Sequence, residues 1–225
     1  DAEVRAQGLR FGTEGIEFDL LVPDGRASVA LPLYGSYNVA NALGCAAVLW
    51  SLGAPAATIA SRLETLPQVP GRLERVRLPS GFPTVLIDYA HTPDALERAL
   101  GALRPLVEGE LAVVCGAGGD RDRGKRAEMG RVAAAGADRV IVTSDNPRTE
   151  DPERIADEIE GGMGNAPREG ILDRRAAIRY ALQHAAPSDL VLLAGKGHET
   201  YQIRGTTLLP FDEREIVTEM LGGVA

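Results

Sequence analysis

Four short segments of the chain place charged side chains next to glycine, proline or asparagine, directly after runs of apolar residues. They are Asp88–Pro93, Gly116–Arg126, Asp145–Arg148 and Gly195–Glu199. A guanidinium group can hold a carboxylate through two parallel hydrogen bonds, and a carboxylate can hold an ammonium group. Side chains of both signs at one site therefore indicate a small zwitterion, such as an amino acid, or the edge of a phosphate.

The segment Gly116–Arg126 shares features with two kinds of nucleotide-binding loop but departs from both patterns. The spacing from Gly119 to Lys125 fits a phosphate-binding P-loop, which then needs Ser or Thr to ligate magnesium, but Arg126 stands there. A dinucleotide fingerprint would need a third glycine where Arg121 stands. We therefore interpret the segment as a glycine-rich strand-to-helix turn that binds a zwitterion or a phosphate. A solvated turn with local ion pairs is the alternative.

The turns at Asp145–Arg148 and Gly195–Glu199 carry the same mixture of charges. Pro147 fixes the backbone of the first turn and Asn146 tolerates unusual dihedral angles, so the turn presents Asp, Asn and Arg side chains together. In the second turn, glycines flank Lys196, and an imidazole and a carboxylate follow. The alternatives are a capped turn before a helix for the first and a flexible surface loop for the second.

The first of the four segments contains the expected start of a helix. Thr92 can cap this helix, with Pro93 at its first position. Asp88 and His91 are then expected to face the same end of the fold as the other charged segments. Tyr89 is expected to pack rather than to take part in chemistry.

The charged segments follow the strands of a predicted α/β fold, a Rossmann-like, mostly parallel sheet with helices on both faces. Its apolar runs, at 84–87, 111–115, 139–142 and 189–194, alternate with helical patterns near 94–104, 125–135, 152–160, 174–185 and 213–221. Ligands of such sheets bind beyond the carboxyl ends of the strands, where the charged segments are expected to meet.

The residues before this pattern are expected to form a separate region. Short strands are expected within 10–33, followed by a buried helix over 37–52 and a second helix over about 55–65. The proline-containing stretch 66–71 is the expected linker. The predicted domains are 1–69 and 70–225.

The composition of the 225 residues argues against several classes of protein. The formal net charge is -8 and there is no long basic run, so no nucleic-acid partner is expected. No apolar run approaches the ~20 residues that span a bilayer, and the N-terminus has no signal pattern, which predicts a cytoplasmic protein without a membrane partner. Cys45 and Cys115 lie in apolar segments and are predicted to be buried free thiols.

Six segments of the chain, in order, resemble the Mur ligases. They are the four charged segments together with Gly35–Asn41 and Gly71–Glu74, so the resemblance runs over about 35–215. Within the family, an Asp-Asn-Pro-Arg turn is typical of ligases that take meso-diaminopimelate rather than lysine. The resemblance implies a three-domain enzyme. This chain would hold the end of the central ATP-binding domain in 1–69 and the Rossmann-like amino-acid-binding domain in 70–225.

The resemblance also implies a reaction and its cofactors. ATP would phosphorylate the side-chain carboxylate of D-Glu in UDP-MurNAc-L-Ala-D-Glu, and an amine of meso-diaminopimelate would attack the acyl phosphate to form an amide. ATP and Mg²⁺ would be held mainly by a part of the central domain that has no counterpart here, since the family's P-loop, magnesium carboxylate and carbamylated lysine are not found in this sequence. We therefore expect these 225 residues to be inactive alone, and we assign no catalytic residue and no metal ligand.

Residue roles follow from the resemblance motif by motif. Seven residues are assigned to meso-diaminopimelate: Arg121, Asp145, Asn146, Pro147, Arg148, Gly195 and Glu199. Five are assigned to the nucleotide: Asn38, Asn41, Arg72, Asp88 and His91. Guanidinium groups at 121 and 148 suit the substrate's carboxylates, and the carboxylate at 199 suits an ammonium group. Asp145 is expected to support its turn.

Two alternatives stay open at this point. One is a related ligase that uses lysine or ornithine, and the other is a stand-alone amino-acid-binding module that never meets ATP. The Asp-Asn-Pro-Arg turn and the Gly-Lys-Gly-His-Glu loop argue against ligases of the folylpolyglutamate and pentapeptide-forming types. A P-loop and a UDP-sugar domain encoded upstream of Asp1 would favour the enzyme.

Overall fold

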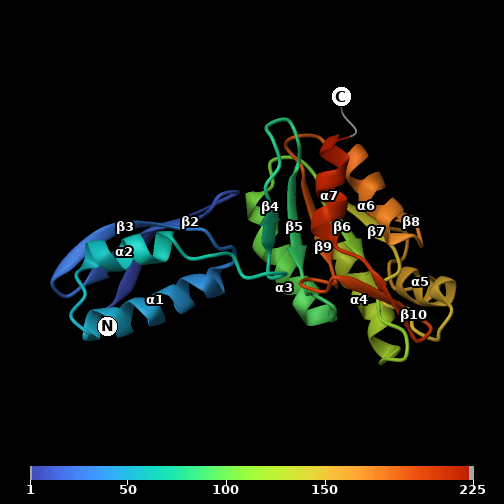
Figure 1. The fold of residues 1–225 in the computed structure, drawn as a ribbon, viewed down its shortest axis with the longest axis horizontal. Coiled ribbons are helices and arrows are strands. Elements are labelled where there is room, and N and C mark those ends of the chain that lie inside the picture. The colour runs from blue at the N-terminus through green and yellow to red at the C-terminus, as the bar shows by residue number, and fades with distance from the viewer. Residues whose placement is uncertain (1, 223–225) are drawn as a thin grey trace. The chain divides into compact units, whose positions relative to one another are not determined.

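The structure is a computed structural model that describes residues 2–222. The chain divides into two compact units, and the boundary lies between Gln68 and Val69 (Figure 1). Within residues 2–222, none of the helices has both the length and the apolar character needed to cross a membrane.

The N-terminal unit is a three-stranded antiparallel sheet with two helices packed on one face. The strands β1 (Arg5–Gly12), β2 (Gly15–Val22) and β3 (Gly25–Leu31) are paired in that order, and the helices are α1 (Ser36–Ser51) and α2 (Ala56–Glu64). Alternate residues of β2 and β3 are buried against the helices, among them Phe18, Leu20 and Val29. The strands and both helices predicted from the sequence are present. However, β1 begins before residue 10, in a segment whose mostly exposed side chains lack an apolar alternation.

Helix α1 is not buried all round, which corrects the sequence-based prediction. Only Val39, Ala42 and Ala46 are buried, on the side that meets the sheet. Cys45 lies outside this side and is exposed, so the prediction of a buried thiol is wrong there. Because a helix of apolar residues buries only the face that has a partner, an apolar sequence does not by itself predict a buried helix. Cys115 is buried as predicted, and burial raises the pKa of its thiol to about 12.

The C-terminal unit is built on a six-stranded sheet. Its strands are β4 (Glu74–Val76), β5 (Thr84–Asp88), β6 (Leu111–Cys115), β7 (Arg139–Val142), β8 (Arg168–Gly170) and β9 (Leu190–Ala194). They are paired in the order β4-β5-β9-β6-β7-β8; β4 is antiparallel to β5 and all other pairs are parallel. A hairpin of β10 (Tyr201–Arg204) and β11 (Thr207–Pro210) stands apart from this sheet. The four long strands confirm the prediction, whereas β4, β8 and the hairpin were not predicted.

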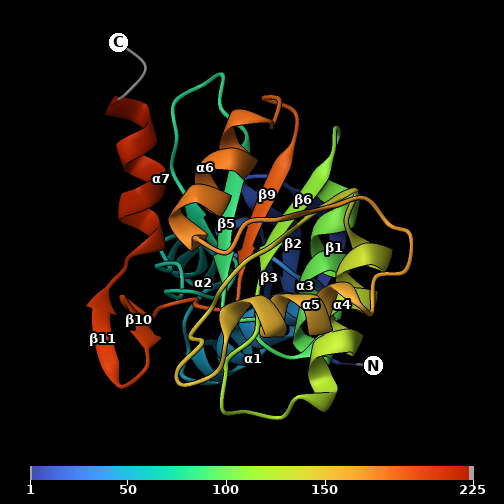
Figure 2. The ribbon, with the colours of Figure 1, turned by 90° about the vertical axis from the view of Figure 1, so that its right-hand side faces the viewer.

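Helices cover both faces of this sheet, as predicted. They are α3 (Pro93–Leu103), α4 (Gly124–Gly136), α5 (Pro152–Glu160), α6 (Arg174–Gln183) and α7 (Glu213–Gly222). Figure 2 shows α6 and α7 on one side of β5, β9 and β6, with α3 and α4 on the other. Val85 and Ile87 pack with residues of α6 and α7, so Leu86 between them faces the other helices. Thr92 caps α3 as predicted, since its hydroxyl accepts a hydrogen bond from the Ala95 amide at 3.3 Å.

The strand order determines which loops meet. The chain returns through α6 to insert β9 between β5 and β6, which reverses the direction in which strands are added. The loop after β9 therefore lies between the loops that follow β5 and β6. Such a reversal is where open α/β sheets bind their ligands.

Two helix glycines give a matched test of this packing. A Cβ on Gly130 in α4 would lie 1.9 Å from the carbonyl oxygen of Ile159 in α5, whereas a Cβ on Gly101 in α3 would meet nothing within 4 Å. We predict that Gly130→Ala lowers the free energy of unfolding by about 1–3 kcal/mol because the helices must separate. Gly101→Ala should raise it by up to about 1 kcal/mol through helix propensity. Urea unfolding followed by circular dichroism measures both, and a stabilising Gly130→Ala would contradict the close approach.

Candidate functional site

A cavity of about 290 Å³ lies beyond the carboxyl ends of β5, β6, β7 and β9. This volume is near the lower end of the range of about 300–1,000 Å³ typical of small-molecule sites. Residues from all four predicted charged segments line it, including the cations Arg121, Lys125, Arg126 and Arg148 and the carboxylates Asp122, Asp145 and Glu199. The cavity is therefore lined by both signs of charge.

The structure brings together some of the predicted site residues but not all of them. Those that line the cavity are Arg121, Asp145, Arg148, Gly195, Glu199 and His91. Asn146, Pro147, Arg72 and Asp88 belong to the same unit without lining the cavity. Asn38 and Asn41 lie on α1 of the other unit, where Asn38 Nδ2 donates to the Tyr34 carbonyl at 2.7 Å and Asn41 Nδ2 donates to Asn38 Oδ1 at 3.1 Å.

Arg121 and Arg148 form a cationic part of the cavity next to Gly118. A Cβ on Gly118 would lie 2.9 Å from Nη1 of Arg148 and 3.6 Å from Cγ of Arg121. Nη1 of Arg148 donates to the carbonyl oxygen of Gly119 at 2.8 Å. Among the described residues, no hydrogen bond is made by Nε or Nη2 of Arg148. These two donors are free to hold a carboxylate through parallel bonds.

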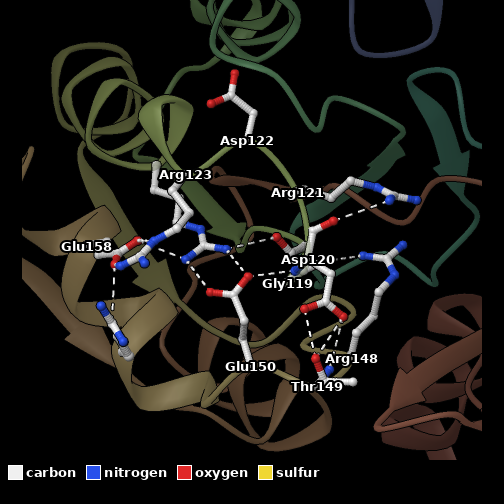
Figure 3. A network of polar contacts seen from close by, with 12 residues as sticks. Gly119, Asp120, Arg121, Asp122, Arg123, Arg148, Thr149, Glu150 and Glu158 are labelled. Carbon is white, nitrogen blue, oxygen red and sulfur yellow. Dashed lines mark hydrogen bonds and ion pairs between the residues drawn. The ribbon is translucent and has the colours of Figure 1, made fainter.

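The loops after β6 and β7 are joined by a polar network, shown in Figure 3. The carboxylate of Asp120 accepts hydrogen bonds from the hydroxyl of Thr149 at 2.8 and 3.0 Å and from its amide at 3.3 Å. In return, the Asp120 amide donates to Oε1 of Glu150 at 2.6 Å. Asp120 therefore supports the two loops instead of facing a ligand.

Arg126 is the buried centre of this network. Its guanidinium contacts Glu150 and Glu158, each at 2.8 Å, and Arg123 also pairs with Glu158. Hydrogen bonds from Arg126 lower the pKa of Glu150 to about 2, and hydrogen bonds from Arg123 chiefly do the same for Glu158. Both carboxylates are therefore ionised at neutral pH, and the loop after β6 is clamped to α5. The arginine at the position where a P-loop has Ser or Thr has this structural role.

Asp145 and Glu199 form an anionic part of the cavity next to Gly195. Asp145 is buried, and its Oδ2 has no hydrogen-bond partner among residues 2–222. A Cβ on Gly195 would lie 2.6 Å from this oxygen, and the φ of +119° at Gly195 is a further reason for glycine there. Asp145 lines the cavity, and the negative charge of its unpartnered carboxylate favours a ligand's ammonium group there.

The hairpin β10–β11 holds the Asp145–Arg148 turn from behind. Gln202 Nε2 donates to the Asp145 carbonyl at 2.8 Å, and the Ile203 amide donates to Asn146 Oδ1 at 2.9 Å. The Arg148 amide donates to the Ile203 carbonyl at 3.1 Å, and the Gly205 amide donates to the Arg148 carbonyl at 2.7 Å. Sequence reasoning missed this support, although Gly205 between two short runs of strand-forming residues is a hairpin signal.

Aromatic and cationic groups surround Tyr89 at the rim of the cavity. The guanidinium of Arg72 lies 5.3 Å from the ring centroid of Tyr89, and the rings of His91 and His198 lie 4.5 and 5.3 Å from it. Tyr89 thus packs, as expected, and also lines the cavity. Asp88 is buried beneath, where it accepts a hydrogen bond from the Leu73 amide at 2.7 Å, and burial raises its pKa.

Sequence comparisons identify relatives of the whole chain. A family model described as "Mur ligase, glutamate ligase domain" matches residues 71–197. A protein of Synechococcus elongatus named UDP-N-acetylmuramoyl-L-alanyl-D-glutamate–2,6-diaminopimelate ligase is 53% identical over 208 residues, which are 92% of this chain and 42% of the relative. A ligase of the same name from Alkalilimnicola ehrlichii is 49% identical over 98% of this chain and 44% of its own length.

Two solved structures are similar to this chain. A structure of a ligase with that name has a TM-score of 0.79 and 37% identity, covering 99% of this chain and 46% of that one. A folylpolyglutamate synthase from Thermotoga maritima, at 23% identity, shares the fold with a TM-score of 0.66 over 85% of this chain and 43% of its own. The chain thus spans less than half the length of these relatives. Because the family model matches more than half of the chain, the chain belongs to the Mur ligase family.

Proposed function

We propose that this chain is the amino-acid-binding part of a ligase that adds meso-diaminopimelate to UDP-MurNAc-L-Ala-D-Glu in peptidoglycan precursor synthesis. The names of its relatives support this substrate pair. On this proposal, ATP activates the D-Glu side chain as an acyl phosphate, an amine of diaminopimelate attacks it, and phosphate leaves as the amide forms.

One observation carries the proposal, namely the separation of charge within the cavity. Arg121 and Arg148 lie next to Gly118, whereas Asp145 and Glu199 line the same cavity and Asp145 lies against Gly195. Diaminopimelate has a carboxylate and an ammonium group at each end. The far end of diaminopimelate can therefore place its carboxylate on the guanidinium groups and its ammonium group on the carboxylates. Lysine has an ammonium group but no carboxylate at its far end, so it would leave the guanidinium groups without that partner.

The remaining assignments also belong to this proposal. Residues 1–69 are the end of a central ATP-binding domain and residues 70–225 the amino-acid-binding domain. Asn38, Asn41, Arg72, Asp88 and His91 are assigned to the nucleotide, and the exposed Arg72 guanidinium and His91 imidazole beside Tyr89 suit phosphate or a base. Within residues 2–222, the His, Cys, Asp and Glu side chains form no group of three that could hold a metal ion. On the family resemblance, ATP and Mg²⁺ are both assigned mainly to the P-loop part of the central domain.

Two alternatives make different predictions. A ligase that takes lysine or ornithine would not need two guanidinium groups in the cavity. A stand-alone amino-acid-binding module would bind diaminopimelate without any dependence on ATP or on the UDP-sugar peptide. Product analysis with the three amino acids, in a ligase of the relatives' full length that contains this chain, distinguishes all three.

The first prediction concerns selectivity at Arg148. Removing one partner of a buried charged pair costs about 2–5 kcal/mol, which is roughly 30-fold to several thousand-fold in affinity. In the longer ligase, Arg148→Ala should therefore raise the KM for diaminopimelate by at least about 30-fold and leave the KM for ATP within about twofold. The kcat/KM for lysine should change little, because lysine makes no second carboxylate contact.

Two controls separate recognition from folding. The φ of Arg148 is +52°, which strains any residue except glycine, so Arg148→Gly removes the same contact while relieving the backbone. Arg98→Ala removes an exposed guanidinium on α3 and should change nothing. Equal losses for lysine and diaminopimelate would mean that Arg148 only supports the turn.

A second prediction concerns the 225 residues alone. We expect them to show neither ATP hydrolysis nor amide formation with Mg²⁺ present, because the loop after β6 departs from a P-loop: Arg126 stands where Ser or Thr would ligate magnesium, and it pairs with Glu150. Phosphate release and product mass measure both activities. Turnover by the isolated chain would overturn the assignment of ATP chemistry to other regions.

A further inference from the structure

Lys196 is an unusual residue in this chain. Only two of the 24 lysine and arginine residues are lysines, Lys125 and Lys196. Lys196 lies between Gly195 and Gly197, whose φ angles are +119° and +54°, and its side chain is fully buried. It does not line the cavity, although Gly195 before it and Glu199 after it do. The backbone at the two glycines therefore turns this cation away from the ligand and into the protein.

The buried ammonium group lies among two hydrogen-bond acceptors and two aromatic rings. Its Nζ donates to Asn146 Oδ1 at 3.0 Å and to Glu199 Oε2 at 3.2 Å. The same atom lies 5.8 Å from the ring centroids of both Tyr201 and Phe211. A buried cation is tolerated only when it is hydrogen-bonded and paired in this way. The hydrogen bonds of the ammonium group join Lys196 to two residues, Asn146 and Glu199.

The contacts of Lys196 determine how the Asn146 amide is oriented. Asn146 Oδ1 accepts from both Lys196 Nζ and the Ile203 amide, so Nδ2 must point the other way. Nδ2 donates to Glu199 Oε2 at 2.8 Å. Two donors thus converge on one carboxylate oxygen of Glu199. The second oxygen, Oε1, is left for a ligand in the cavity.

We propose that Lys196 is a positioning residue for amino-acid recognition: it fixes the Asn146 amide and one oxygen of Glu199, so that the other oxygen receives the substrate's ammonium group. This inference rests on the proposed function. It also gives Asn146 a role beneath the cavity, acting through Glu199. A lysine suits the position because its compact ammonium group has three donors that fit between two rings, whereas a planar guanidinium is wider and fixed in shape.

The test uses a ligase of the relatives' full length that contains this chain. Lys196→Met should raise the KM for diaminopimelate by about 10-fold to 100-fold, the range expected for losing a charged hydrogen bond, and should leave the KM for ATP within about twofold. Lys196→Gln keeps a donor without the charge and should show a smaller rise; it also serves if the Met variant does not fold. Glu199→Gln should show a rise at least as large as that of Lys196→Met.

The double variant Lys196→Met/Glu199→Gln is the decisive measurement. If Lys196 acts through Glu199, the double variant should have the KM for diaminopimelate of Glu199→Gln alone, within about twofold. Arg139→Met is the matched control. Like Lys196, Arg139 donates hydrogen bonds to a carbonyl oxygen, that of His184, and to a carboxylate, that of Glu110, but it lies at the opposite end of the sheet. This variant should leave both KM values unchanged.

The outcomes separate the two proposals. A wild-type ligase that does not use diaminopimelate overturns the proposed function. A wild-type ligase that does, with an unchanged KM in Lys196→Met, overturns the role of Lys196. Equal rises in both KM values, or additive losses in the double variant, would make Lys196 a structural residue and would equally overturn its positioning role.

Discussion

Arg148 has a backbone φ of +52°, a conformation that costs a residue other than glycine about 1 kcal/mol or more, and the cavity depends on its being held there. Two backbone hydrogen bonds to the hairpin hold the turn on one side. On the other side, the guanidinium of Arg148 donates to the Gly119 carbonyl. Because these bonds come from loops far apart in the sequence, the cationic part of the cavity forms only when the sheet has brought those loops together.

Side chains that pair with other groups of the protein hold in place the groups that are left to meet a ligand. The Arg126 pairs clamp the loop after β6, and the hairpin supports the turn after β7. Lys196, in the loop after β9, supports Asn146 and Glu199. This arrangement keeps several charges in fixed positions while leaving one oxygen of Asp145 without a partner among the described residues. Fixed charges of both signs distinguish ligands by the spacing of their own charges, which is the property that separates diaminopimelate from lysine.

The sheet of the C-terminal unit and the location of its charged loops could be predicted from the sequence. Four continuous apolar runs are long enough to indicate buried parallel strands, and a segment with charged side chains follows each run directly. The three-residue strands β4 and β8 are too short to leave such a pattern. The exposed side of α1, including Cys45, depends on which face has a partner, and sequence periodicity does not supply that.

Within the site, the residue types indicated which segments would line the cavity. The direction in which each side chain points could not be predicted from the sequence. The residues at 121, 145, 148, 195 and 199 line the cavity together. Asn146 was expected to touch the ligand, yet its amide is occupied by Glu199, Lys196 and Ile203. Whether Lys196 points inward depends on the φ angles of two glycines and on aromatic rings supplied by residues 201 and 211. These contacts are tertiary and leave no local signal in the sequence.

A crystal structure of the 225-residue chain with diaminopimelate tests the central claim most directly. We predict one carboxylate of the ligand on the guanidinium groups of Arg121 and Arg148, and the neighbouring ammonium group on Glu199 Oε1 and beside Asp145, with the Asn146 amide unmoved. A ligand bound outside this cavity, or one held with its ammonium group toward the two arginines, would contradict it.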